Sequence, residues 1–501
     1  MPQASRRAAR LSAARRIRLA ALAVLLPVAL ASAPHLRAAA SPDPAFPVRA
    51  VKIIGPPGAP ATRAHVEFSV AAGFDALWVV GPAAGQWSSA GAPAGPRLDP
   101  AFVELARWCR ERGVRIFVSV NPVAEAGGTF VFSDPESATR LRAFFKRLRR
   151  ECGVRDFVLS FDDLPRDLLE INDLIEYGRS TAGAHLDLAR RVLRRLGAGS
   201  TYWLCGSAYS DWHLDDPEYR AYSAPWLEAL PKLPSRIGIV WTGPDTISES
   251  ITLDDLRATR RRLGNRRLLL YDNYPVNDDW RREALALVLG PLRRRDPRLH
   301  EDVAVYLACP MEELGASRLP LLTIADYLRD PAAYDPDASW KRAIARLAGP
   351  DPAALDALRT QAAEWGGWVG SLNYHGEDAA PQDLAAEIDD PGIMASWNYT
   401  LRRYEERMAA LARVEDRAFR DDVLEAMRRR LVVARALPLV RSLRGSSGAT
   451  SSSKEEALRA LAAERRRVAS DLNAAKTLDR FLDAVGLLEE VKKLPEEASG
   501  P

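Results

Sequence analysis

The chain has 501 residues, of which 47% are hydrophobic and 27% are charged, a composition typical of a folded globular protein. Its formal net charge of +4 includes seven arginines within residues 1–40, and without them the charge is −3. The apparent basicity therefore belongs to the N-terminus, which argues against a nucleic-acid partner. After residue 40, no apolar stretch is long enough to cross a bilayer.

The N-terminal segment has the three parts of a secretory signal peptide. A basic region from Arg6 to Arg18 precedes the apolar run Leu19–Ala31, and small residues at 38–40 form a cleavage site before Ser41. We therefore expect residues 1–40 to be a signal peptide and the mature protein to be exported, either to a periplasm or to the exterior. An uncleaved membrane anchor is the alternative.

A regular alternation of short apolar runs and helical patterns begins near residue 51. The runs are apolar throughout, as in strands buried on both faces. They predict eight strands: Val51–Gly55, Ala76–Gly81, Arg115–Asn121, Phe157–Asp163, Thr201–Ser207, Arg236–Gly243, Arg267–Pro275 and Ala304–Pro310. Eight β-then-α units favour an α/β fold, a (β/α)₈ barrel over residues 41–345, with an open doubly wound sheet as the alternative.

Helices are expected between these strands and throughout the C-terminal part. The helical stretches Pro100–Gly113, Ala138–Gly153, Ala182–Gly197 and Leu253–Gly264 each end at glycine, the usual residue after a helix. Residues 346–445 form a helical region, 446–453 a Gly/Ser linker, and 454–501 a C-terminal helix and tail. We expect this part to be a bundle that packs on the barrel.

Neither the cysteines nor the glycines indicate a cofactor. The four cysteines fit no zinc-binding spacing, so they are either free thiols or include one Cys109–Cys152 bridge. No glycine-rich phosphate loop follows a strand, so we expect no nucleotide. The histidines share no ligand spacing, so we expect no metal. The oligomeric state is not indicated.

The most informative polar residues are Asp162 and Asp163, which follow the fourth predicted strand. Catalytic groups of a barrel lie at the carboxyl ends of its strands. Two adjacent acids repel each other, which should raise the pKa of one of them and suit it to general acid chemistry. Both face the barrel mouth only if the strand bends there. The alternative is that one acid caps a helix and the other is solvated.

Aromatic and amide side chains follow the next predicted strands, in patterns that suit a sugar. Taken in order, the motifs Phe161-Asp-Asp, Trp241-Thr-Gly-Pro, Asp272-Asn-Tyr-Pro-Val-Asn-Asp and Pro320-Leu-Leu-Thr-Ile-Ala-Asp-Tyr-Leu resemble glycoside hydrolase family 84. This family comprises β-N-acetylglucosaminidases, O-GlcNAc hydrolases and hyaluronidase-like enzymes. The resemblance covers roughly residues 50–345.

The resemblance implies retaining hydrolysis of N-acetylhexosamine glycosides, in which the substrate's own acetamido group forms an oxazoline. Asp162 would polarise the acetamido N–H, and Asp163 would act as general acid and then base. No cofactor is needed. The resemblance implies substrate contacts from Gly55, Tyr209, Tyr271, Asn273 and Asp278.

The sequence departs from the family pattern at several sugar contacts. Ala83 stands where the family has a lysine, and Cys309 stands where it has an asparagine. Gln86 and Trp87 are candidates to replace these contacts, although ordinary loop positions describe them better. A glycan-binding protein without turnover is therefore an alternative function, and a structural scaffold built on a barrel is another.

Overall fold

The computed structural model describes residues 45–87, 96–126, 130–164, 167–193, 197, 199–277, 287–365, 397–444, 451–484 and 486–494. The expected signal peptide, the start of the expected linker and Asp278 lie outside these residues. Among the helices within these ranges, none combines the length and the apolarity needed to span a bilayer.

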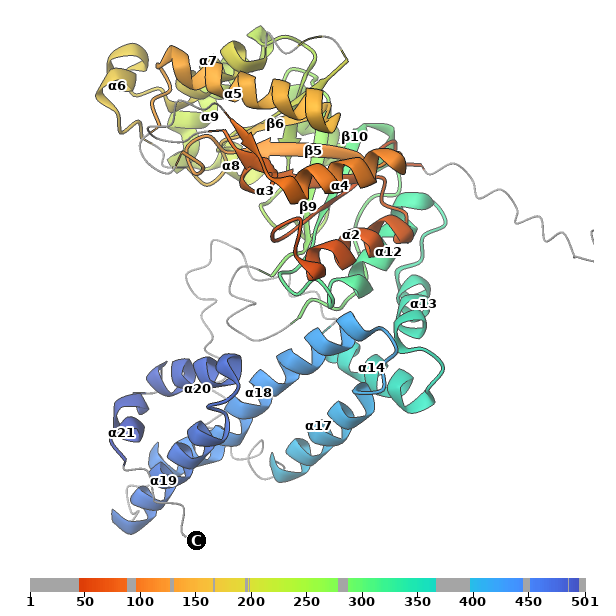
Figure 1. Ribbon diagram of the computed structural model, residues 1–501, viewed down its shortest axis with the longest axis vertical. Helices are drawn as coiled ribbons and strands as arrows, with labels where there is room; N and C mark the ends of the chain where they lie inside the picture. The colour runs from red at the N-terminus through yellow and green to blue at the C-terminus, as the bar shows by residue number, and fades with distance from the viewer. Residues whose placement is uncertain are drawn as a thin grey trace, which may run out of the picture. The chain divides into compact units, whose positions relative to one another are not determined.

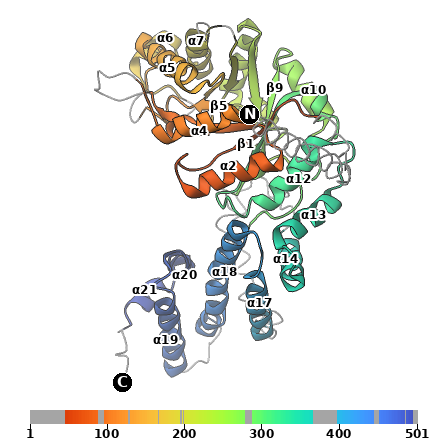
Figure 2. The ribbon, with the colours of Figure 1, turned by 45° about the vertical axis from the view of Figure 1, so that its right-hand side comes forward.

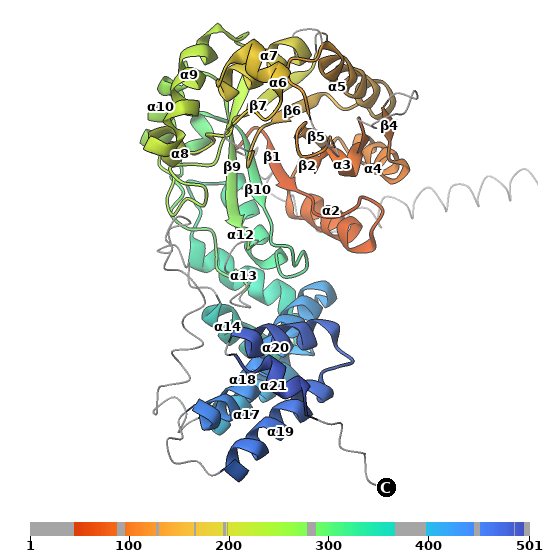
Figure 3. The same cartoon turned by 90° about the vertical axis from the view of Figure 1, so that its left-hand side faces the viewer.

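Within the described residues, eight parallel strands close into a barrel in the order β1-β10-β9-β8-β7-β6-β5-β2 (Figure 3). The strands are β1 (Arg49–Lys52), β2 (Ala76–Val80), β5 (Arg115–Val120), β6 (Asp156–Ser160), β7 (Thr201–Cys205), β8 (Ile237–Trp241), β9 (Leu268–Pro275) and β10 (Val303–Cys309). The predicted barrel is confirmed, and the open-sheet alternative is wrong. A two-stranded ribbon of β3 (Gly85–Gln86) and β4 (Arg97–Leu98) follows β2.

Helices surround the strands (Figure 1). They are α2 (Pro60–Ala72), α3 (Gly81–Ala84), α4 (Pro100–Glu111), α5 (Pro135–Arg147), α6 (Ile171–Tyr177), α7 (Thr181–Leu193), α8 (Asp211–Asp215), α9 (Arg220–Ala229), α10 (Leu253–Arg262) and α12 (Arg318–Arg329). Short 3₁₀ turns lie at Pro217–Tyr219, Leu230–Lys232 and Leu299–Glu301, and a π-helical turn lies at Leu148–Cys152.

Several helices begin at the same two-residue signal, an aspartate followed by a proline. Asp99, Asp134, Asp335 and Asp351 each accept hydrogen bonds from backbone amides of the first helical turn, and each is followed by proline at the first helical position. The carboxylate satisfies amides that have no partner within the helix, and proline lacks the amide that would go unused. The sequence thus fixes these helix starts locally.

The strands alternate between two hydrophobic layers. Inward-facing side chains fill the barrel; they are Val48, Ala50, Ala76, Trp78, Phe117, Val158, Trp203, Cys205, Val240, Leu269, Val305 and Leu307. Outward-facing residues such as Val51, Leu77 and Leu270 belong to the layer beneath the helices. Because side chains alternate along a strand, this register decides which residues reach the barrel mouth.

A buried ion pair lies on the outward side of β9. Arg295 donates to both carboxylate oxygens of Asp272, at 2.7 and 2.8 Å, and both side chains are nearly inaccessible. Tyr306 of β10 also donates to Asp272, and Arg295 donates to the backbone carbonyl of Glu249 at 3.0 Å. The pair ties two strands to the loops beside them, and removing either partner would leave a buried charge without compensation.

The cysteines are not bridged. Cys109, Cys152, Cys205 and Cys309 are all free and buried. Burial raises the pKa of the Cys109 thiol to about 12 and that of Cys152 to about 11. Of the two alternatives that the sequence left open, free thiols are therefore confirmed.

The C-terminal part is helical, as predicted. Its helices are α13 (Pro336–Ala348), α14 (Pro352–Glu364), α17 (Trp397–Leu411), α18 (Arg417–Arg444), α19 (Ser451–Arg467), α20 (Leu472–Ala484) and α21 (Leu488–Lys492). Helices α17 and α18 lie side by side (Figure 2). The first half of α18 packs into a core with α12, α13 and α14, whereas its second half packs into a separate core with α19 to α21. The predicted domain boundaries stay predictions.

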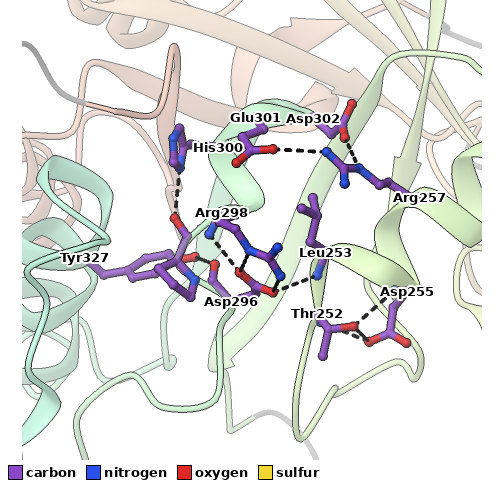
Figure 4. Close-up of polar contacts among 11 residues, drawn as sticks. Thr252, Leu253, Asp255, Arg257, Asp296, Arg298, His300, Glu301, Asp302 and Tyr327 are labelled. Carbon is purple, nitrogen blue, oxygen red and sulfur yellow. Dashed lines mark hydrogen bonds and ion pairs between the residues drawn. The ribbon is translucent and has the colours of Figure 1, made fainter.

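A polar network joins α10 and α12 to the loop before β10 (Figure 4). Asp296 accepts from the Arg298 side chain at 2.9 and 3.1 Å and from the amide of Leu253, at the start of α10, at 3.3 Å. Tyr327 of α12 donates to the Asp296 carbonyl at 2.7 Å. Hydrogen bonding from Arg298 lowers the pKa of Asp296 to about 2.

We expect Asp296→Asn to lower the stability of the fold at neutral pH by about 1–2 kcal/mol, because the charged hydrogen bonds to Arg298 are lost. The folded-state pKa of Asp296 is depressed, so its contribution is present above about pH 4 and is lost as the pH falls toward 2. The melting temperatures of variant and wild type should therefore converge in acid. Asp167→Asn, which neutralises an exposed acid, is the control, and a constant difference across this pH range would contradict the prediction.

Candidate active site

A cavity of about 430 Å³ opens at the carboxyl ends of the barrel strands. Its lining includes at least one residue at or just beyond the end of each of the eight strands. The inward-facing positions are Lys52, Trp78, Val80, Ser119, Asn121, Ser160, Asp162, Cys205, Val240, Thr242, Tyr271, Asn273 and Cys309. The volume is within the range of small-molecule sites. Five of the seven predicted site residues line it: Asp162, Asp163, Tyr209, Tyr271 and Asn273.

The two acids lie in a turn rather than in the strand predicted to contain them. Strand β6 ends at Ser160, and Asp163 has a backbone φ of +53°. This left-handed conformation, which aspartate tolerates better than most residues, breaks the alternation of the strand. The turn supplies the bend that both acids need in order to line the same cavity.

The turn gives the two carboxylates different surroundings. Asp162 is half-buried and accepts from the Ser160 hydroxyl at 2.5 Å, while Asn121 donates to its backbone carbonyl at 3.2 Å. Asp163 is exposed, and the Tyr209 hydroxyl donates to it at 3.0 Å. Asp162 is thus a fixed acceptor, and Asp163 is a solvent-accessible acid beside a phenol. This difference in environment suits one acid to orientation and the other to proton transfer.

Aromatic rings form another wall of the cavity. Trp78 and Tyr271 meet edge to face with ring centroids 5.6 Å apart, and the Tyr271 hydroxyl lies 3.5 Å from the Cys309 sulfur. Asn273, also on β9, lines the cavity and donates its amide to the Thr246 carbonyl at 2.7 Å. Rings and an oriented amide together suit a ligand with apolar faces and polar edges, such as a pyranose.

Two of the predicted substrate-binding residues, Gly55 and Asp278, are not among the described residues that line the cavity. Gly55, with φ +85°, lies in the turn between β1 and α2 beside Thr62 and is not part of the lining. Strand β1 ends at Lys52, three residues before the predicted strand end at Gly55. Asp278 lies outside the described residues.

Two residues that line the cavity, Glu125 and Lys52, are not among the predicted site residues. Glu125 accepts from the Asn121 amide at 2.8 Å and from the Trp87 indole at 3.1 Å. Trp87 is therefore a buried support for Glu125 rather than a sugar contact. No periodic pattern marks Glu125, because it lies in a loop. Lys52 could have been found from its inward register with Val48 and Ala50.

Glu125 joins the acid pair through Asn121. Its carboxylate holds the Asn121 backbone, and the Asn121 side chain reaches Asp162. Burial raises the pKa of Glu125 to about 8, and the charge of Asp162 adds to this effect. The Glu125 carboxylate also packs closely against Gly81, where an added Cβ would collide with it.

Within the described residues, no group of three or more histidine, cysteine or acidic side chains is arranged to hold a metal ion. The polar groups that the described residues bring to the cavity are carboxylates, two phenols, aliphatic hydroxyls, thiols, amides and an ammonium.

Comparison with known proteins points to one family. A family model described as beta-N-acetylglucosaminidase matches residues 97–363, just over half of the chain. Protein O-GlcNAcase from Rattus norvegicus is 25% identical over 231 residues, and the mouse protein (Mus musculus) is 24% identical over 230; each match covers 46% of this chain. The chain matches only about a quarter (24%) of the length of these relatives.

A solved structure has the same fold as this chain over most of the length of both proteins. An O-GlcNAc hydrolase variant from Thermobaculum terrenum is 22% identical, with a TM-score of 0.59, over 89% of this chain and 96% of that chain. The likeness therefore extends beyond the barrel into the helical part of the chain.

We expect Glu125→Gln to flatten the dependence of thermal stability on pH. The raised pKa of Glu125 means that its contribution is full below about pH 4, where the unfolded chain is also protonated, and is lost as the pH rises through about 8. Glutamine resembles the protonated form and does not titrate. The melting temperature of the wild type should therefore fall more steeply than that of the variant between about pH 5 and pH 8.

Glu176→Gln, which alters an exposed acid on α6, is the matched control and should retain the wild-type slope. Identical slopes in all three proteins would contradict the assignment of a raised pKa to Glu125.

Proposed function

The chain belongs to the β-N-acetylglucosaminidase family, glycoside hydrolase family 84, and from that premise we propose that it hydrolyses β-linked N-acetylhexosamine glycosides with retention of configuration. The observation that carries this proposal is the acid pair Asp162-Asp163, two adjacent carboxylates in one cavity with unlike surroundings. The matched relatives are named for action on O-GlcNAc.

The first step of the proposed reaction is attack by the substrate itself. The acetamido oxygen of the sugar forms a bond to the anomeric carbon as the bond to the leaving oxygen breaks. Asp162, fixed by Ser160 and close to Asn121, accepts a hydrogen bond from the acetamido N–H and stabilises the positive charge that develops there. Asp163 donates a proton to the leaving oxygen. The product of this step is a protonated oxazoline, an oxazolinium ion, whose N–H stays hydrogen-bonded to Asp162.

The second step reverses these roles. Asp163, now ionised, removes a proton from a water molecule, whose oxygen attacks the anomeric carbon and reopens the oxazoline. Asp162 keeps its hydrogen bond to the nitrogen. Two inversions at the anomeric carbon give net retention, and no carboxylate of the protein forms a bond to the sugar. This differs from the common two-carboxylate scheme, in which one acid is a nucleophile.

Export is a separate proposal, supported by the composition of residues 1–40. A basic region, an apolar run and a small-residue site in this order are typical of a signal peptide. N-terminal sequencing of the protein recovered from its native cell tests it, with Ser41 expected as the first residue.

A glycan-binding protein without turnover is the second candidate, favoured by Cys309. This buried thiol lines the cavity where the family resemblance implies an asparagine. In this case N-acetylglucosamine binds, no product is released from a chromogenic glycoside, and Asp163→Asn leaves the affinity unchanged.

We expect Asp163→Asn to lower kcat on chromogenic β-N-acetylglucosaminides by about 10²- to 10⁴-fold, the usual contribution of general acid–base catalysis. Because a good leaving group needs less protonation, the loss should be smaller for 4-nitrophenyl than for 4-methylumbelliferyl or alkyl glycosides. Asp167→Asn, on the same loop, should retain full activity. Equal losses across these leaving groups would contradict the role of Asp163 in the first step.

Asp162→Asn should lower kcat by a similar factor for every leaving group, because acetamido attack accompanies each cleavage. Proton NMR of the wild-type reaction should show the β-anomer as the first product. An initial α-anomer would exclude retention.

A further inference from the structure

Lys52 supplies the ammonium group in the lining of the cavity. It is the last residue of β1 and follows the inward register of Val48 and Ala50, which belong to the barrel interior. Its Cα partner on the neighbouring strand is Trp78, which also lines the cavity. The strand therefore places the lysine one layer above the apolar core, at the base of the site.

The Lys52 ammonium lies over an aromatic ring. Its Nζ is 5.8 Å from the centroid of Tyr271, close enough for a weak cation–π contact. The lysine is half-buried, and within the described part of the chain it forms no ion pair. Arg49, three residues earlier and facing outward, behaves differently, since it pairs with Asp75 at 2.7 Å. The ring fixes the direction of Lys52 without satisfying its three donors.

The strand order places Lys52 away from the acid pair. In the closed barrel, β1 is separated from β6 by β2 and β5 on one side and by four strands on the other. Asp162 and Asp163 follow β6, and Tyr209 follows β7, which lies directly opposite β1. A ligand held between these walls would meet carboxylates along one edge and an ammonium along another.

We propose that Lys52 is a substrate-binding residue whose ammonium donates hydrogen bonds to ring hydroxyls of the N-acetylhexosamine, on the edge remote from the acid pair. This inference rests on the proposed function and names a contact in the same site. The ligand it implies is a neutral sugar, because among its described residues the lining holds Asp162 and Asp163 against the ammonium of Lys52, which disfavours an anionic ligand. Lys52 thereby provides a cation that Ala83 cannot.

The test is Lys52→Met, which keeps the stem and removes the donors. We expect the affinity for N-acetylglucosamine, measured by titration calorimetry, to fall about 10- to 100-fold, as for loss of a charged hydrogen bond. The KM for a chromogenic N-acetylglucosaminide should rise by a similar factor, while kcat changes less than about threefold. Lys146→Met, at an exposed position of α5, is the matched control and should leave both values unchanged.

Deoxy sugars separate a direct contact from a structural role. Wild type should lose affinity for the 3-, 4- or 6-deoxy sugar that lacks the partner hydroxyl, whereas Lys52→Met should bind that analogue as it binds N-acetylglucosamine. Lys52→Gln, with a shorter donor, should lie between the two proteins and provides the same comparison if the methionine variant fails to fold.

The outcomes distinguish the two proposals. If wild type turns over substrate and neither Lys52 variant shows altered binding, KM or deoxy-sugar response, the role of Lys52 is refuted and the proposed function stands. If wild type neither binds nor hydrolyses an N-acetylhexosaminide, both proposals are refuted.

Discussion

Alternation of side chains in a closed parallel barrel is the constraint on which the cavity depends. All eight strands point the same way, so their carboxyl ends share one rim, and every second residue faces the interior. Ala50, Val158 and Leu269 face inward and fill the core. Two residues further along the same strands, Lys52, Ser160 and Tyr271 also face inward and line the cavity. A one-residue change of register would exchange these polar groups for outward-facing apolar ones. Core packing and site chemistry are therefore set by a single geometric condition.

The acid pair departs from this alternation, and its surroundings compensate for the departure. A strand cannot place two consecutive side chains in one cavity, and the positive φ of Asp163 provides the turn that does. Two other segments meet there: Asn121 and Glu125 lie in the loop after β5, and Trp87 follows the β3 strand. Asp162 is thus held by contacts that reach two neighbouring loops, whereas Asp163 remains accessible to solvent. Such a support limits the movement of the group that must be oriented and leaves the proton-transfer group free to exchange with water.

The sequence predicted those features that depend on local pattern. Continuous apolar runs marked all eight strands, and their ends marked Asp162 and Asp163, whereas Tyr209, Tyr271 and Asn273 were predicted as substrate contacts from the family resemblance. The ends of the strands were predicted less well, because residues such as Gly55 and Asp163 follow an apolar run in the sequence but form no hydrogen-bonded pairs with a neighbouring strand. Lys52 lies at the end of an apolar strand and is recognised as a lining residue only from the register of the whole strand. Glu125 lies in a loop without periodicity, and its indole partner Trp87 is distant in sequence. The state of the four thiols likewise depended on three-dimensional packing.

Helix α18 belongs to two hydrophobic cores at once, and this affects how the chain resists denaturation. Residues such as Phe419, Val423 and Met427 pack with α12 to α14, whereas Val432, Leu437 and Val440 pack with α19 to α21. The second core has fewer buried residues than the first, so we expect it to open at a lower free energy. The helix would then fray only from its distal half, so backbone amides on either side of residue 430 would exchange with solvent at different rates. One continuous helix thus belongs to two cores, and we expect its distal half to open before its proximal half as the chain is denatured.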